Sequence, residues 1–153
     1  MKKKGGFTIL ELLIVLAIVG TLVGVAVYTL GISRTKSRDS KRVSDISVLR
    51  SSLSQYWLQK ASYPVTQGDG VLLGSPGSNA DGLTSEGFVG QGGGGAVILP
   101  MVPVGPKAGE CYRYKGVTGG YSLQFKTERD TAYGKAGTYF AHSGGVDQED
   151  TEK

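Results

Sequence analysis

The chain has 153 residues and a formal net charge of +4 at pH 7. Beyond a long apolar segment near its start, about 120 residues remain, which is enough for one small domain but not for two. The single cysteine, Cys111, excludes an internal disulfide. The single histidine, His142, offers no clear Ser/His/Asp arrangement, so we expect a surface or structural histidine and no enzyme activity.

The chain begins with Lys2-Lys3-Lys4-Gly5-Gly6, followed by an apolar run from Phe7 to Ile32 in which Glu11 is the only charge. From Leu12 to Ile32 a helix would be roughly 30 Å long at about 1.5 Å per residue, which matches a bilayer hydrocarbon core of roughly 30 Å. We therefore expect a membrane-spanning helix with Glu11 near one edge of the bilayer.

Three interpretations of this segment differ in what they explain. A cleaved secretory signal would have a shorter apolar core followed by an Ala-x-Ala-like site, which this segment lacks. A plain membrane anchor explains the length and the lysines, but it explains neither Glu11 nor the glycine pair before the apolar run. The third is a resemblance: the stretch from Lys2 to Val15, KKKGGFTILELLIV, resembles the processing and methylation motif of type IV pilins and of type II secretion pseudopilins.

This resemblance implies a processing site and an assembly residue. In that family a membrane aspartyl peptidase cleaves after the glycine matching Gly6, on the cytoplasmic side, and N-methylates the new first residue, here Phe7. The glutamate matching Glu11 pairs with the terminal amine of a neighbouring subunit. Physical chemistry supports such a pairing, because a carboxylate at the bilayer edge is costly unless it is neutralised. The chain departs from the family pattern in having no proline before Pro64. Local unwinding of the helix on assembly would therefore depend on Gly20, Gly24 and Gly31.

Charge alone does not orient the segment in the membrane. Three lysines precede it, and a second basic group follows it, namely Arg34, Lys36, Arg38, Lys41 and Arg42. The resemblance, not the charge, implies that the amino terminus is cytoplasmic. The second basic group is either a solvated helix face or a contact for anionic lipid headgroups.

The helix is expected to continue beyond the membrane. Apolar residues recur at steps of three and four and form one stripe, while Arg42, Asp45, Arg50 and Gln55 fall largely elsewhere; the stripe consists of Val43, Ile46, Leu49, Leu53, Tyr56 and Trp57. One continuous helix from Phe7 to about Ala61 follows. Tyr63-Pro64 marks its end, because proline disfavours helix at the preceding residue, and a similar Tyr-Pro is common in pseudopilins.

Residues 65–109 have loop composition, rich in Gly, Ser, Asn and Asp, with short apolar pieces at 71–73 and 96–99. The glycine run 92–95 lacks the Lys-Ser/Thr and the preceding strand of a P-loop. We therefore expect a surface loop available for subunit contacts and no nucleotide site.

The carboxyl-terminal part changes to a two-residue period. Residues 112–115 and 121–126 alternate between apolar and polar side chains, and 116–120 supply a turn, which predicts a hairpin. Residues 138–141 form an expected third strand. Cys111 is interpreted as a small buried hydrophobe and not as a reactive thiol. The acidic end, 146–153, is expected to fray.

No metal site is expected, although Asp147, Glu149, Asp150 and Glu152 are clustered in the sequence and some secretion pseudopilins bind calcium near their carboxyl ends. The glycine-anchored twelve-residue calcium loop is missing from the sequence, and a terminal acidic tail is usually solvated. We also expect no cofactor.

Together these features predict an α+β fold of the pilin type, with a long amino-terminal helix packed on a small antiparallel sheet. The expected organisation is a leader (1–6), a transmembrane and assembly helix (7–32), an amphipathic continuation (33–61), a globular head with a Gly-rich loop and a sheet (62–146), and a polar tail (147–153).

The function that follows from the resemblance is that of a structural subunit of a type IV pilus or a related pseudopilus. The subunit would reside in the cytoplasmic membrane, amino terminus inside, and then join an extracellular or periplasmic homo-oligomeric filament. Its implied partners are the prepilin peptidase, an assembly ATPase, a platform membrane protein and membrane lipid. The alternative is a low-abundance tip subunit that binds DNA, a surface or a secreted substrate through the basic face from Arg34 to Lys60.

Overall fold

The structure, a computed structural model, describes residues 6–152 and contains one helix and eight strands in that range. The lysines and Gly5 of the proposed leader lie outside the described residues. Helix α1 (Ile9–Lys60) is continuous over 52 residues, as the apolar run and the amphipathic stripe predict. The chain forms two units, one that ends at Thr35 and one that begins at Lys36, and each is described here by itself.

The first unit contains the apolar part of α1. Its side chains from Ile9 to Leu30 are exposed within this chain, and this stretch is long and apolar enough to cross a membrane. The hydroxyls of Thr21, Thr29 and Thr35 donate to the carbonyls of Ile18, Val25 and Gly31, at 2.8–2.9 Å. The threonine hydroxyls are thus satisfied by their own helix, which suits an apolar surrounding.

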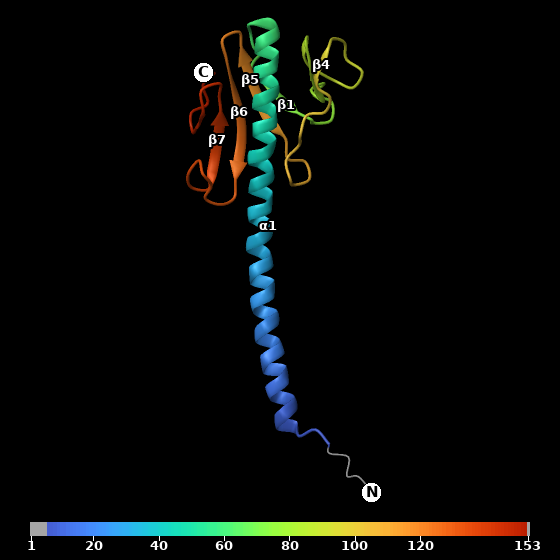
Figure 1. Ribbon diagram of the computed structural model, residues 1–153, viewed down its shortest axis with the longest axis vertical. Helices are drawn as coiled ribbons and strands as arrows, with labels where there is room; N and C mark the ends of the chain where they lie inside the picture. Colours follow the sequence, from blue (N-terminus) through green and yellow to red (C-terminus); the bar gives the residue numbers. More distant parts are fainter. Residues whose placement is uncertain (1–5, 153) are drawn as a thin grey trace. The chain divides into compact units, whose positions relative to one another are not determined.

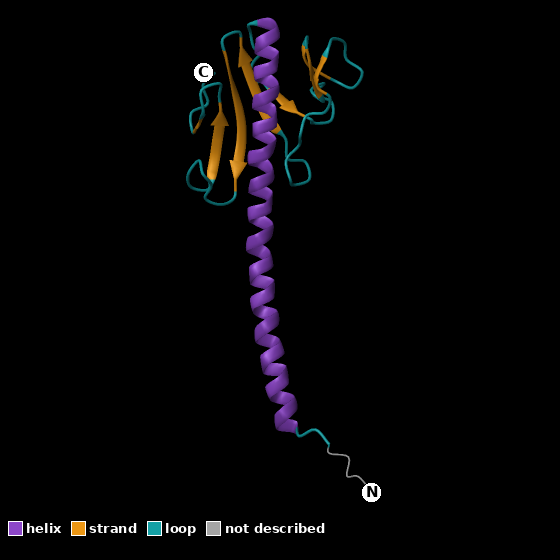
Figure 2. Cartoon of the chain, viewed as in Figure 1, coloured by secondary structure: helices purple, strands orange, loops and turns teal. Residues whose placement is uncertain are grey.

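The second unit contains the rest of α1 and two antiparallel sheets (Figures 1 and 2). The larger sheet has the strand order β1-β5-β6-β7-β8, formed by Val71–Leu73, Tyr112–Val117, Gly120–Thr127, Gly137–Ala141 and Val146–Asp147. The smaller sheet has the order β3-β2-β4, formed by Gly87–Val89, Gly82–Thr84 and Val97–Leu99.

The core lies between α1 and the larger sheet. The predicted stripe is buried at Ile46, Leu49, Leu53 and Tyr56, whereas Trp57 remains 37% exposed. The stripe meets a layer of aromatic and aliphatic side chains from β5, β6 and β7, namely Tyr112, Tyr114, Tyr121, Leu123, Phe125 and Tyr139. The α+β, pilin-like layout predicted from the sequence is therefore confirmed.

The predicted hairpin is β5–β6, and the expected third strand is β7. The turn is shorter than predicted, because Val117 pairs with Gly120 and only residues 118–119 lie between the strands. Gly116 lies so close to the carbonyl of Pro64 and the hydroxyl of Tyr114 that a Cβ there would clash. The segment leaving α1 is thereby held along the end of β5, where Thr66 N donates to Gly116 O at 2.9 Å.

Two expectations were wrong in detail. The end of the chain contributes β8, and Asp150 Oδ2 accepts from Lys115 Nζ at 2.8 Å while its Oδ1 accepts from Ser122 Oγ at 3.0 Å, so the acidic end packs on β5 and β6 instead of fraying. This cover explains why Ser122 is buried although the alternation predicts that it faces solvent. The loop region also contains four short strands, β1 to β4.

Candidate functional site

The predicted processing site lies in an exposed, non-helical segment directly before α1. A side chain added at Gly6 would meet nothing within 4 Å, and Phe7 is 80% exposed. Residues 6–8 have no regular secondary structure. A peptide bond in such a segment is accessible to a peptidase, which needs an extended backbone at the bond that it cleaves.

Thr8 caps the helix that follows. Its Oγ1 accepts from the backbone N–H of Glu11 at 3.2 Å, and its carbonyl accepts from Leu12 N at 3.2 Å. Thr8 is therefore the N-cap and Glu11 the third helical residue, the spacing of a capping box. A carboxylate in the first turn also interacts favourably with the helix dipole. Within the described residues Glu11 makes no ion pair.

The second unit contains a charged cluster around two buried residues, Asp39 and Arg42. We define the charged cluster as Arg38, Asp39, Arg42, Lys107, Glu110 and Glu128. Arg42 is 2% exposed. Its Nε and Nη2 donate to the two oxygens of Glu110 at 2.6 and 2.8 Å, and its Nη1 lies 2.7 Å from Asp39 Oδ1 and 2.8 Å from Glu128 Oε1. One guanidinium thus joins α1 to the loops on either side of the β5–β6 hairpin.

The rest of the charged cluster completes these contacts. Glu128 accepts from Arg38 in a bidentate pair at 2.9 and 2.7 Å and lies 3.0 Å from Lys107. Asp39 also accepts from the backbone N–H groups of Glu128 and Arg129. Hydrogen bonding to Arg42 lowers the pKa of Glu110, and hydrogen bonding to Arg38, with further help from Lys107 and Arg42, lowers the pKa of Glu128 well below its usual value.

A second polar contact inside the core joins α1 to β5. Asp45 Oδ2 accepts from the Tyr112 hydroxyl at 2.8 Å and from Lys41 Nζ at 2.6 Å. Burial, followed by the hydrogen bond to Asp45, raises the pKa of Tyr112. Sequence reasoning placed Arg42 and Asp45 off the buried stripe, and the structure corrects this. The spacings 39/42 and 41/45 are ion-pair spacings on a helix, but the distant partners Glu110 and Glu128 have no local sequence signal.

His142 is structural. It is 2% exposed, its Nδ1 lies 3.0 Å from the carbonyl oxygen of Tyr121, and its Nε2 lies 3.1 Å from Asp147 Oδ1. It therefore joins β6 and β8 at the end of β7. Cys111 is half-buried just before β5.

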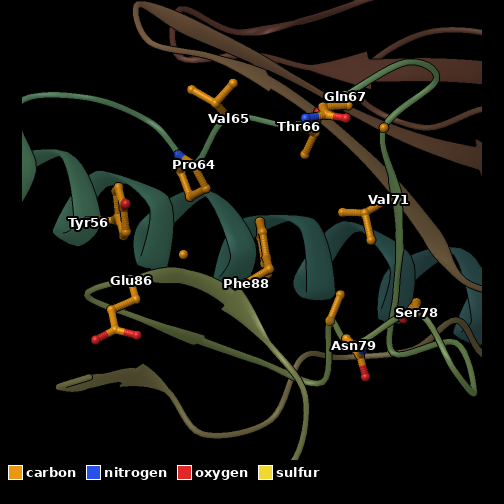
Figure 3. A pocket seen from close by; sticks show the side chains of 13 residues that line it. Tyr56, Pro64, Val65, Thr66, Gln67, Val71, Ser78, Asn79, Glu86 and Phe88 are labelled. Atoms are coloured by element: carbon orange, nitrogen blue, oxygen red, sulfur yellow. The ribbon is translucent and has the colours of Figure 1, made fainter. Parts of the chain in front are cut away.

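A pocket of about 410 Å³ lies between the end of α1, the segment after it and the β2–β3 hairpin (Figure 3). Tyr56, Pro64 and Phe88 are among its lining side chains, and the carboxylate of Glu86 points away from the other labelled ones. The lining contains no histidine, cysteine, lysine or arginine, so it offers no acid–base pair. No group of three or more His, Cys, Asp or Glu within residues 6–152 is arranged to hold a metal ion.

The comparisons with known proteins cover part of the chain. Residues 1–27 match the family model described as the prokaryotic N-terminal methylation motif. The chain carries a prepilin-type methylation motif. It is 40% identical over 76 residues to the type II secretion system core protein G of Dickeya chrysanthemi, covering 49% of this chain and 50% of that protein.

Two further relatives have the same name. The core protein G of Escherichia coli K12 is 39% identical over 75 residues, covering 48% of this chain and 52% of that protein. That of Vibrio cholerae is 38% identical over 77 residues, covering 50% and 53%. The chain thus matches about half the length of these relatives. No solved structure matches it significantly.

Proposed function

We propose that this protein is a structural subunit of a type II secretion pseudopilus. The observation that supports this most is the methylation motif at residues 1–27, which extends into an exposed apolar helix that begins at Ile9. The named relatives favour a secretion pseudopilus over a surface pilus, an alternative that the motif alone leaves open.

Processing is the first proposed step. The prepilin peptidase cleaves after Gly6 and methylates the amine of Phe7, and the apolar helix stays in the product. The accessible backbone at residues 6–8 supports cleavage at this bond. The Thr8 cap lies beyond the cleaved bond, so α1 keeps its cap in the mature chain.

Assembly is the second proposed step. The subunit waits in the cytoplasmic membrane with its amino terminus inside, and an assembly ATPase and a platform membrane protein supply the work of extraction. In the filament the apolar helices pack on those of neighbouring copies. This packing stabilises the extracted subunit by about 25 cal/mol for each Å² of apolar surface that would otherwise contact water. Glu11, which is without an ion pair among residues 6–152, pairs with the Phe7 amine of the next copy and sets the axial register.

The tip-subunit alternative loses much of its support. Three of the seven cations between Arg34 and Lys60 are engaged in ion pairs, and one of them, Arg42, is buried. Cations that are already paired with carboxylates are less available to the phosphates of a nucleic acid, so this face is poorly suited to bind one. Copy number separates the two roles, because a main subunit dominates sheared filaments and a tip subunit is barely detectable in them.

Mass spectrometry of assembled protein tests the proposal. The expected mature chain starts at Phe7 and carries one added methyl group. Gly6→Val is expected to leave precursor in the membrane, because it places a branched side chain at the cleaved bond. Gly24→Val is the matched control, since a side chain there also meets nothing within 4 Å, and it should be processed normally. Intact Met1 in assembled material would overturn the proposal.

A further inference from the structure

Six lysines and arginines of the second unit, on α1 and on the loops before and after the β5–β6 hairpin, differ in whether they form ion pairs. Arg38, Lys41, Arg42 and Lys107 are engaged in ion pairs with carboxylates of the same unit. Lys36 on α1 and Arg129 on the β6–β7 loop are exposed, and neither makes an ion pair with any residue in the range 6–152. The charges of the first four are therefore neutralised within the fold, whereas those of Lys36 and Arg129 are not neutralised by an ion pair within residues 6–152.

The two unpaired cations line one pocket of about 480 Å³. Ser40, Val43 and Thr131 are also part of its lining. This volume lies within the range of about 300–1,000 Å³ that is usual for small-ligand sites. The pocket belongs entirely to the second unit.

The two carboxylates of this pocket do not cancel its positive charge. Asp39 is buried and accepts from Arg42 Nη1 and from the backbone N–H groups of Glu128 and Arg129. It is thereby compensated inside the fold. Asp130, whose Oδ1 accepts from Ala136 N at 3.0 Å, is the remaining anion against two cations. The pocket is therefore net positive and is suited to an anionic group.

We propose that this pocket, between Lys36 and Arg129, binds the phosphate of an anionic phospholipid headgroup while the subunit waits in the membrane. The inference rests on the proposed membrane phase of the function. The guanidinium fork of Arg129 matches phosphate oxygens in a bidentate way, and Lys36 adds a point charge.

The position of Lys36 in the sequence supports a lipid as the occupant. Lys36 follows Ile32, the last residue of the apolar run, by four residues of the same helix. At about 1.5 Å per residue this is about 6 Å, the depth of a headgroup layer and not of bulk solvent. In the proposed orientation Lys36 lies at the non-cytoplasmic leaflet, and a basic residue next to a membrane helix is attracted there when that leaflet contains anionic lipid.

Hydrogen exchange of the full chain in nanodiscs tests the inference. Discs that hold one copy are prepared from phosphatidylcholine alone or with phosphatidylglycerol added. We expect slower exchange of the backbone amides at 130–133 when phosphatidylglycerol is present, and loss of this slowing in high salt. Each cation near an anionic surface contributes roughly a fivefold preference. Lys36→Glu and Arg129→Glu each remove a positive charge and add a negative one, so each should reduce the slowing by more than about fivefold.

Lys60→Glu is the matched control, an exposed lysine in the last turn of the same helix, and it should leave the slowing unchanged. Unchanged exchange in the strand β6 shows that the variants remain folded. Equal exchange in the two lipids, or equal slowing by inorganic phosphate in phosphatidylcholine discs, would overturn the lipid assignment. Slowing that requires two copies per disc would also overturn it, in favour of a carboxylate from a second copy. Failure of the chain to insert at all would instead contradict the proposed function.

Discussion

At the scale of single residues, Arg42 determines how α1 is held on the sheet. Its guanidinium meets three carboxylates, of which Asp39 lies on its own helix and Glu110 and Glu128 come from the two sides of the β5–β6 hairpin. A buried arrangement of this kind adds little stability compared with an apolar one, but it is costly to leave incomplete, because the buried Asp39 and the partly buried Glu110 would lose the guanidinium that neutralises them.

Replacing Arg42 is therefore expected to be strongly destabilising. Arg42→Ala should lower the free energy of unfolding by about 3–5 kcal/mol, and Arg42→Lys should recover only part of this, because an ammonium cannot form the bidentate pair with Glu110. Urea unfolding of the full chain in detergent, followed by tyrosine and tryptophan fluorescence, measures the change. Lys36→Ala, at an exposed site, should shift stability by less than about 0.5 kcal/mol. A stable Arg42→Ala protein would show that the apolar core alone holds the helix.

The same carboxylates predict how stability depends on pH. The pKa values of Glu110, Glu128 and Asp150 are all lowered in the folded protein by their cationic partners. Their contribution is therefore fully present well above the ordinary pKa values of 4.5 for glutamate and 3.8 for aspartate, and it is lost as the pH falls below these values. Urea midpoints should be equal at pH 7 and pH 6 and should fall progressively below pH 5. A Glu110→Gln, Glu128→Gln double variant should have a flatter acid limb, and an identical limb would contradict this account.

At the scale of elements, the end of α1 contains a strained residue. Ala61 has a φ of 51°, in the left-handed region that suits glycine, and its N–H donates to the Trp57 carbonyl at 2.7 Å. It is thus the left-handed C-cap of the helix, a position that costs a residue with a side chain about 1 kcal/mol.

Ala61→Gly is expected to stabilise the protein by about 1 kcal/mol by removing this cost. Ala61 is exposed, so the substitution removes no core contact. Ser51→Gly is the contrasting control, because it places glycine in the middle of the same helix and should destabilise by about 0.5–1 kcal/mol. The two thermal unfolding midpoints should move in opposite directions, and a lower midpoint for Ala61→Gly would contradict the role of the cap.

Elements with enough residues to repeat a pattern could be predicted from the sequence, and shorter ones could not. The stripe in α1 and the alternation in β5 and β6 extend over several periods, so each was visible. Strands β1 to β4 have three residues each, too few for a two-residue period to be distinguished from loop composition. The motif from Gly6 to Glu11 was visible because it is contiguous, whereas the charged cluster joins residues up to 90 positions apart, as in the Arg38–Glu128 pair.

At the scale of the whole molecule, an apolar helix and a compact domain share one chain, and Glu11 is the only charge between Phe7 and Ser33. Glu11→Ala should still be processed and inserted but should enter filaments poorly, because it removes the carboxylate that we propose to pair with the terminal amine of the next copy. Glu11→Gln separates charge from shape and should fail similarly. The measurement is filament yield with the variant as sole copy and in competition with unaltered subunits. Normal yield from both variants would mean that apolar packing alone sets the register.

The bonds that attach α1 to the sheet also decide how the protein responds to force. Contacts from Asp39 and Arg42 reach Glu110, Glu128 and the backbone of Arg129 from within a single helical turn. A pull on the helix would load these contacts at the same moment, so they would rupture together and not one after another. Forced unfolding is governed by the unfolding rate and not by equilibrium stability. The charged cluster is thus expected to act as a mechanical clamp between α1 and the loops on either side of the β5–β6 hairpin.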